Sequence, residues 1–257
     1  MNQGSNMRLI CSIGSCLSAN VAYQMHKLIP NWYRVSSVQH NRIDQLNSIY
    51  IERKYKPLGL SDIGFELSAE YKHVNTVDNQ IKGVGLGRSL PKKDDPLPLI
   101  DVLDCIDFGK IDIFIFDNFA ELLFKLYRHR ELNTPMFINE HYLTGKAELF
   151  VFENKFMSPR DVYESYSSVF KYISNKNPAC KIVFIPFPIK LKSDENLNVR
   201  YQEQLTVLNE LKSFFYNLYI IPERDIQHSD LLRHGDIYHF NDSCYLNYAR
   251  DLIREII

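Results

Sequence analysis

MRLICSIGSCLSANVAYQM, residues 7–25, carries in direct succession the signals of a buried strand, a tight turn and a helix. The apolar run 9–13 has the length of a strand, and the amphipathic segment 17–28 predicts a helix. Residues 14–16, Gly-Ser-Cys, form the turn between them. A side chain at this turn lies at a helix N-terminus, where unpaired backbone N–H groups and the helix dipole favour developing negative charge. The stretch therefore predicts a rigidly held nucleophile on an α/β scaffold.

The turn offers two candidate nucleophiles, Ser15 and Cys16. We favour Cys16, because a thiolate is intrinsically the better nucleophile and because a helix N-terminus or a nearby imidazolium lowers the pKa of a thiol. The alternative is that Cys16 is a small side chain packed into the turn, without a part in any reaction. The turn by itself leaves both interpretations open.

A second motif lies near the other end of the chain, where residues 234–240 read HGDIYHF. Asp236 and His239 form an Asp-x-x-His pair just before a predicted helix at 242–256. In a catalytic triad the carboxylate fixes the imidazole tautomer and steadies its cation, and the imidazole takes the proton from the nucleophile. The plainer alternative is an Asp that caps a turn beside a His in a polar loop. The order of the motifs, a nucleophile turn first and Asp-x-x-His last, favours the catalytic interpretation.

The length of 257 residues indicates a single domain, 1–257, with room for a sizeable core. The 30 Lys and Arg balance the 31 Asp and Glu, which argues against a nucleic-acid partner. No apolar run approaches the length of a membrane span, and the N-terminus lacks the pattern of a signal peptide. The odd number of Cys, without paired spacing, predicts reduced thiols in a cytoplasm and no metal site. The cysteines are Cys11, Cys16, Cys105, Cys180 and Cys244.

Beyond residue 28, short runs rich in apolar and β-branched residues alternate with longer amphipathic segments. The predicted strands are 31–38, 111–116, 181–186 and 218–221, and the predicted helices are 119–127, 158–174, 197–216 and 242–256. This alternation predicts a parallel sheet covered on both faces, which is a three-layer α/β/α sandwich. With five strands, the natural candidate is the flavodoxin-like order 2-1-3-4-5. Residues 45–105 are predicted to form an irregular insertion or lid within the domain.

In that strand order, the loops after the first three strands and the loop before the last helix meet at one edge of the sheet. The residues expected to converge there are Cys16, Ser37, Asn118 and His239. His141 follows a short predicted strand at 136–138 and is a candidate substrate ligand or second acid or base. Plainer roles stay open for three of these residues: Ser37 in an ordinary turn at 36–37, Asn118 as a helix N-cap, and His141 as a structural loop residue.

The motifs resemble those of a known superfamily. Gly-Ser-Cys-Leu at 14–17 resembles the Gly-Asp-Ser-Leu block of the SGNH (GDSL-type) hydrolases, and Asp-x-x-His resembles their last block. Within this group the chain looks most similar to the GSCFA family and related capsular polysaccharide biosynthesis proteins. The resemblance implies Cys16 as nucleophile, His239 as base and Asp236 as the residue that orients it. The resemblance also implies an oxyanion hole built by the Cys16 N–H, the loop at Ser37, and Asn118.

These features together predict acyl transfer through a covalent acyl-enzyme. The resemblance and the expected cytoplasmic location favour a carbohydrate O-acetyltransferase with acetyl-CoA as co-substrate and no tightly bound cofactor. The first alternative is a carbohydrate esterase or deacetylase, in which water replaces the sugar hydroxyl. A second alternative, from another class, is a non-catalytic ligand-binding protein on the same fold. The alternation at 148–152 predicts a hairpin strand that covers the site or pairs with a second subunit, so a homo-oligomer is also an open expectation.

Overall fold

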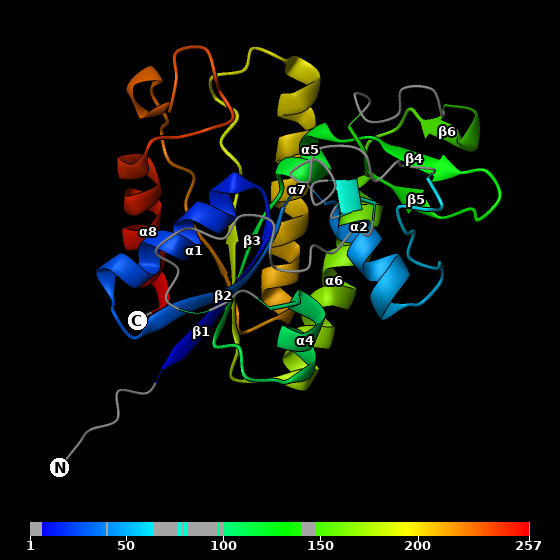
Figure 1. Ribbon diagram of the computed structural model, residues 1–257. Helices are drawn as coiled ribbons and strands as arrows, with labels where there is room; N and C mark the ends of the chain where they lie inside the picture. The colour runs from blue at the N-terminus through cyan, green and yellow to red at the C-terminus, as the bar shows by residue number, and fades with distance from the viewer. Residues whose placement is uncertain are drawn as a thin grey trace.

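The structure, a computed structural model, describes residues 7–39, 41–63, 77–78, 80–81, 97, 100–139 and 147–256. Its centre is a five-stranded parallel sheet in the order β2-β1-β3-β7-β8 (Figure 1). The strands are β1 (Arg8–Gly14), β2 (Trp32–Gln39), β3 (Ile113–Asp117), β7 (Lys181–Ile185) and β8 (Leu218–Ile220). Numbered within this sheet alone, the order is 2-1-3-4-5. The predicted flavodoxin-like order is therefore confirmed.

The central strands are mostly apolar because both faces of the sheet are covered. In β3, Ile113 and Ile115 point into one core cluster, while Phe114 and Phe116 point into the other. This alternation follows from the two-residue period of a strand. The sheet is thus the middle layer of the predicted three-layer α/β/α sandwich.

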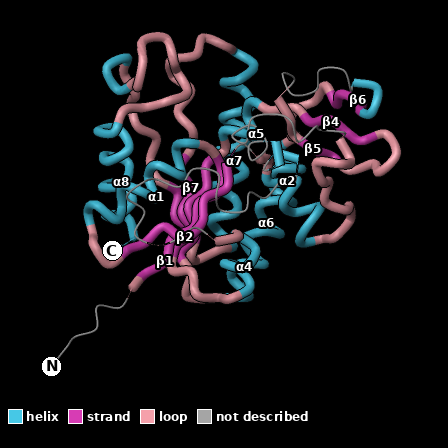
Figure 2. The backbone as a smooth tube through the Cα atoms, in the orientation of Figure 1, coloured by secondary structure: helices cyan, strands magenta, loops and turns pink. Residues whose placement is uncertain are grey.

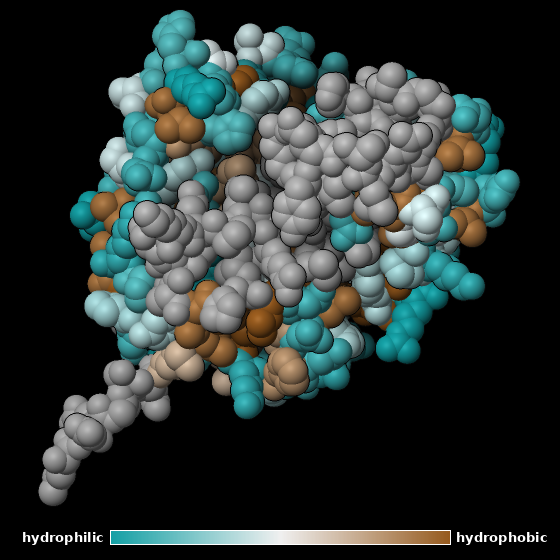
Figure 3. All heavy atoms as spheres, viewed as in Figure 1, coloured by the Kyte–Doolittle hydropathy of each residue, from teal (hydrophilic) through white to brown (hydrophobic). Residues whose placement is uncertain are grey.

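The helices divide between the two faces, as Figures 1 and 2 show. The helices on one face are α1 (Cys16–Leu28) and α8 (Asp242–Ile256), and those on the other are α4 (Val102–Asp107), α6 (Pro159–Lys176) and α7 (Glu195–Phe214). The first turns of α7 also reach the α1–α8 side, where Leu197 and Tyr201 join the core cluster of that face. Among the described helices, none combines the length and apolar character needed to cross a bilayer. Hydrophilic side chains cover much of the described surface visible in Figure 3, and apolar ones form small separate groups.

The predicted helix 119–127 is wrong in its second half. Helix α5 (Phe119–Leu123) ends early, and β4 (Leu126–His129) follows it. Strand β4 lies between β5 (Pro135–Met136) and β6 (Phe150–Glu153) in a second, antiparallel sheet. Pairing with β6, reinforced by an Arg128–Glu153 ion pair of 2.7 Å, outweighs the local helical pattern. The predicted strands 136–138 and 148–152 overlap β5 and β6.

The turn predicted at 36–37 is also wrong. Strand β2 continues through these residues to Gln39, in register with Ser12 to Gly14 of β1. A short helix, α2 (Ile43–Leu46), and a π-helical turn, Asn47–Ile51, follow. The end of α2 and the π-helical turn fall in the part of the chain, 45–105, for which an insertion or lid is predicted, and much of that segment lies outside the described residues. The insertion and the single-domain boundaries stay predictions.

Candidate active site

The turn between β1 and α1 is built around Gly14 and Ser15. Gly14 has φ +152°, and a Cβ at this position would lie 2.5 Å from Oδ2 of Asp117. Only glycine therefore allows the strand to pass so close to that carboxylate. Ser15 is the N-cap of α1, and its Oγ accepts a hydrogen bond of 3.0 Å from the Leu17 N–H. This bond satisfies one of the free N–H groups of the first helical turn.

Asp117, the last residue of β3, holds this turn in place. Its Oδ2 accepts hydrogen bonds from Ser15 N at 2.8 Å, Ser15 Oγ at 3.0 Å and Ser18 N at 3.0 Å. Its Oδ1 accepts from Phe119 N at 3.1 Å and so caps α5 as well. The side chain is buried, and this burial raises the pKa of Asp117 against the opposing effect of its donors. Asp117 is the site residue that sequence analysis missed.

The geometry favours Cys16 over Ser15 as the nucleophile. The Ser15 hydroxyl donates a hydrogen bond to Asp117 and accepts one from the Leu17 N–H. Ser15 as a whole is 3% exposed. Cys16 is the first residue of α1 and is half-buried, whereas the four other cysteines are buried. Burial raises the pKa of Cys180 and of Cys244 to about 12, so these thiols keep their protons at neutral pH. Cys16 is therefore the cysteine within reach of a substrate.

Asp236 and His239 form a hydrogen-bonded pair. His239 Nδ1 lies 2.9 Å from Asp236 Oδ2 and 3.0 Å from Oδ1. Partial burial acts to raise the pKa of Asp236, but hydrogen bonds from His239 and from the Tyr238 N–H outweigh it and lower that pKa below its usual value. The aspartate is thus ionised at neutral pH and fixes Nδ1 as the donor, which leaves Nε2 to accept a proton. The His239 side chain is 43% exposed.

Aromatic contacts hold the loop of this pair at the carboxyl ends of β3 and β7. The ring of Tyr238 packs edge-on against Phe119, which follows β3, with centroids 5.6 Å apart. The ring of Phe240 packs on Phe187, which follows β7, at 5.9 Å. Cys16 lies at the carboxyl end of β1, the strand beside β3. The two predicted motifs therefore lie at the same edge of the sheet.

Tyr245 of α8 lies between the Cys16 turn and the His239 loop. Its hydroxyl accepts a hydrogen bond of 3.1 Å from the Phe240 N–H. Burial raises the pKa of Tyr245 to about 12, and the nearby Cys16 adds to this effect. Helices α1 and α8 pack along each other, and Gln24 Nε2 donates to Asp242 at 3.5 Å (Figure 1). Tyr245 is thus close both to the Cys16 thiol and to the backbone next to His239.

Among the described residues, the side chains predicted to bind the oxyanion are held by hydrogen bonds to other groups of the protein. Asn118 is fully buried, its Nδ2 donates to Gln204 Oε1 at 2.9 Å, and its Oδ1 accepts from the Phe187 N–H at 2.8 Å. This amide braces α7 and the segment after β7, so the geometry does not support the oxyanion role predicted for it. Ser37 is buried within β2, where its Oγ accepts from Ser12 Oγ at 3.1 Å. His141 lies outside the described residues.

Within the described ranges, no group of three or more His, Cys, Asp or Glu side chains is arranged to hold a metal ion. The side chains that gather at the carboxyl edge of the sheet are those of a thiol, an imidazole and a carboxylate. Their chemistry is proton transfer and nucleophilic attack.

The chain matches no protein-family model and no curated protein in sequence. Solved structures similar to it include an α/β hydrolase enzyme from the metagenome of Lake Arreo, Spain, with 8% identity, a TM-score of 0.51, and coverage of 96% of this chain and 94% of the other. A family two carbohydrate esterase from Clostridium thermocellum has 13% identity and a TM-score of 0.47; the match covers 97% of this chain but only 63% of the esterase. At such identities the likeness concerns the fold alone: the chain shares a three-layer α/β/α fold with the Lake Arreo enzyme.

Proposed function

We propose that this protein is an ester hydrolase that forms an acyl-enzyme on Cys16, with acylated carbohydrates as the first substrates to test. The observation that carries the proposal is the hydrogen-bonded Asp236–His239 pair at the same sheet edge as the half-buried Cys16 thiol. The carbohydrate class comes from the resemblance to capsular polysaccharide proteins.

The proposed reaction has two halves. His239 Nε2 takes the proton of the Cys16 thiol, and the sulfur attacks the ester carbonyl. The oxyanion forms beside the N-terminus of α1, whose N–H groups and dipole favour negative charge. Collapse of this intermediate breaks the ester C–O bond, and the imidazolium returns its proton to the leaving alkoxide. In the second half, His239 takes a proton from water as its oxygen attacks the thioester carbonyl; the C–S bond breaks, the acid leaves, and the imidazolium returns the proton to the Cys16 sulfur.

Hydrolysis is favoured over acetyl transfer by the exposure of the general base. A transferase must keep water from its acyl-enzyme, whereas a hydrolase uses water as the acceptor. The side chains of His239 and Asp236 are 43% and 30% exposed. Transfer from acetyl-CoA to a sugar hydroxyl is the second candidate. It uses the same residues and differs only in the acceptor.

A non-catalytic binding protein is the third candidate. Its support is that Ser37 and Asn118 are both buried and hydrogen-bonded within the protein. If the N-terminus of α1 were too weak an oxyanion site without them, the fold would bind esters or sugars without turnover.

The test is acyl-enzyme formation and turnover with p-nitrophenyl acetate, in the wild type and in Cys16→Ala, Ser15→Ala and His239→Ala. Cys180→Ala, a buried cysteine just before β7, is the matched control. We expect an acetyl adduct on Cys16 by intact mass, loss of the adduct in Cys16→Ala but not in Ser15→Ala or Cys180→Ala, and a rate loss on the order of three decades in His239→Ala. Adding acetyl-CoA with a sugar acceptor distinguishes the second candidate, because only a transferase releases CoA in proportion to the acetylated sugar.

Two results would reject the main proposal. Full activity of Cys16→Ala would remove the nucleophile, and the absence of both adduct and turnover in a folded wild type would leave the binding candidate.

A further inference from the structure

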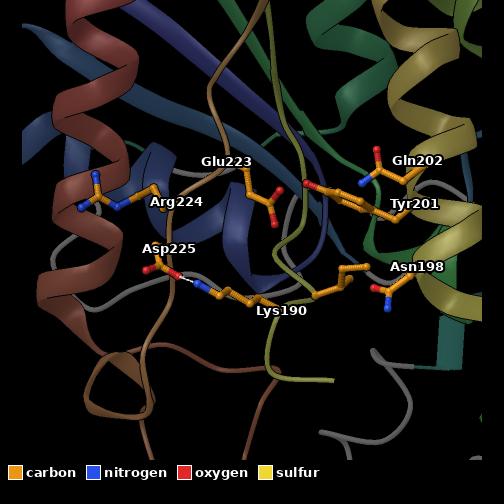
Figure 4. Close-up of a pocket in the computed structure, with 8 residues that line it drawn as sticks. Lys190, Asn198, Tyr201, Gln202, Glu223, Arg224 and Asp225 are labelled. Atoms are coloured by element: carbon orange, nitrogen blue, oxygen red, sulfur yellow. Dashed lines mark hydrogen bonds and ion pairs between the residues drawn. The ribbon is translucent and has the colours of Figure 1, made fainter. Parts of the chain in front are cut away.

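A cavity of about 380 Å³ opens beside the first turns of α7, and neither Cys16 nor His239 lines it (Figure 4). Its volume is within the usual range of small-molecule sites, roughly 300–1,000 Å³. Its walls come from three segments: α7, the segment after β7 and the segment after β8. Like the candidate active site, it lies at the carboxyl edge of the sheet.

The charges at its rim are mostly neutralised by ion pairs. Lys190 pairs with Asp225 across the opening, as the dashed line in Figure 4 marks. Arg224 pairs with Asp251 of α8. Glu223 makes no ion pair with a described residue, so one carboxylate faces the cavity without a counter-ion. The rim therefore offers a ligand one carboxylate that can accept hydrogen bonds from hydroxyl groups.

The wall holds hydrogen-bonding groups that the protein uses only in part. Tyr201 is 1% exposed; among the described residues its hydroxyl has no partner at full hydrogen-bond geometry, and the acceptor that it interacts with is the Glu223 carboxylate. In Figure 4 this hydroxyl points across the cavity toward Glu223. Burial raises the pKa of Tyr201, and the charge of Glu223 and its hydrogen-bond interaction with the phenol add to this effect, so the phenol stays a proton donor. A buried polar group without a partner costs about 1–3 kcal/mol, and a ligand that accepts from it regains part of this cost.

Two amides extend the same wall. Asn198 and Gln202 line the cavity from α7, one and two turns into the helix, and within the described chain their side chains form no hydrogen bond. An amide offers both donors and acceptors. Ile189 adds an apolar surface. Amides, a phenol, one carboxylate and an aliphatic side chain together complement a ring that carries hydroxyls at its rim and C–H groups on its face.

We propose that this cavity binds a neutral sugar unit. The segment between β7 and α7 connects it to the candidate active site. On one side of this segment, Phe187 packs on Phe240, and Lys192 lies over the ring of Tyr238, 4.1 Å from its centroid. On the other side, Lys190 lines the cavity. A sugar in the cavity would thus be separated from the His239 loop by the segment between β7 and α7. That this sugar is part of the substrate hydrolysed at Cys16 rests on the proposed function.

The test measures, by ligand-observed NMR, the binding of cellobiose, xylobiose and N-acetylglucosamine to the full chain. The variants are Tyr201→Phe, which removes only the hydroxyl, and Glu223→Gln. Glu203→Gln on α7 is the matched control, because this exposed side chain does not line the cavity. We expect at least one sugar to bind, each cavity variant to weaken it about fivefold or more, and the control to leave it unchanged.

The proposal is overturned if none of the three sugars binds the folded wild type, or if the bound sugar is held equally well by both cavity variants. Thermal unfolding of each variant shows that it is folded. Binding is also measured in Cys16→Ala, which cannot form the acyl-enzyme. If the wild type binds a sugar in the cavity but has no turnover, only the proposed hydrolysis is rejected. If it has turnover but binds no sugar in the cavity, only this inference is rejected.

Discussion

At the scale of single residues, the Cys16 turn depends on a close contact between Gly14 and Asp117. The carboxylate of Asp117 binds three donors of the turn and fills the space that a Cβ on Gly14 would need. The two residues are more than a hundred positions apart in the sequence. This contact explains why the turn begins with glycine, and it fixes the direction in which α1 presents Cys16.

Gly14→Ala should lower the free energy of unfolding by about 3 kcal/mol, because it adds an overlap with Asp117 to the strain of a positive φ. Gly235→Ala is the control: its φ is +81°, and nothing lies within 4 Å of the added Cβ, so it should cost only about 1 kcal/mol. Urea denaturation measures both. In an Asp117→Ala background the cost of Gly14→Ala should shrink towards that of the control, and an unchanged cost would show that the overlap is not the cause.

At the scale of elements, α8 fixes the His239 loop through Tyr245. The Phe240 N–H donates to the Tyr245 hydroxyl, and Tyr245 N in turn donates to Asn241 O at 3.2 Å. The loop is thereby tied to the first turn of the helix on both sides. Since α8 packs on α1, the same contacts set the position of the imidazole relative to the thiol.

Tyr245→Phe should reduce kcat by about tenfold and leave KM unchanged, because the Phe240 N–H loses its acceptor and the imidazole loses its fixed position. The pH dependence of kcat should change as well, which a purely structural role would not produce. Tyr248→Phe is the matched control on the same helix, since the buried Tyr248 hydroxyl has no hydrogen-bond partner among the residues that the structure describes. If both variants have the same kcat and pH profile, Tyr245 does not position the loop.

The helices and strands show which features the sequence predicts and which it does not. The last helix was predicted at 242–256, and α8 has these bounds, because its apolar spacing is local information. The predicted helix 119–127 failed after Leu123, because pairing with β6 decides residues 126–129. The roles of Asp117 and Asn118 also cannot be predicted from the sequence. Their partners, Ser15 and Gln204, lie 102 and 86 positions away, and no local pattern encodes those distances.

At the scale of the whole molecule, a buried acid ties α5 to the segment that opens α2. Glu121 is buried, its Oε1 accepts from the Ile43 N–H at 2.7 Å, and its Oε2 has no partner at full hydrogen-bond geometry in the described part of the chain. Burial raises the pKa of Glu121 to about 8, against the opposing effect of the Ile43 N–H. The folded protein therefore holds a proton at Glu121 that the unfolded chain releases near its ordinary pKa of 4.5.

The free energy of unfolding should fall as the pH rises from about 4.5 to about 8, by up to about 1.4 kcal/mol per pH unit from this group. In that window the folded state binds the proton and the unfolded state does not. Asp117, whose pKa is also raised by burial, acts in the same direction. Glu121→Gln isolates the effect, since it keeps the acceptor for Ile43 and cannot ionise. Urea denaturation at several pH values should give a flatter curve for the variant; parallel curves would contradict the assignment.

The central claim is that Cys16 and His239 act as a pair across the sheet edge. The most direct measurement is the rate at which iodoacetamide alkylates Cys16 at about pH 6, where an isolated thiol is almost entirely protonated. If the imidazole takes the thiol proton, the wild type should react at least tenfold faster than His239→Ala, with the label on Cys16 by mass spectrometry. Equal rates for the two folded proteins would show that the imidazole does not act on the thiol and would contradict the account.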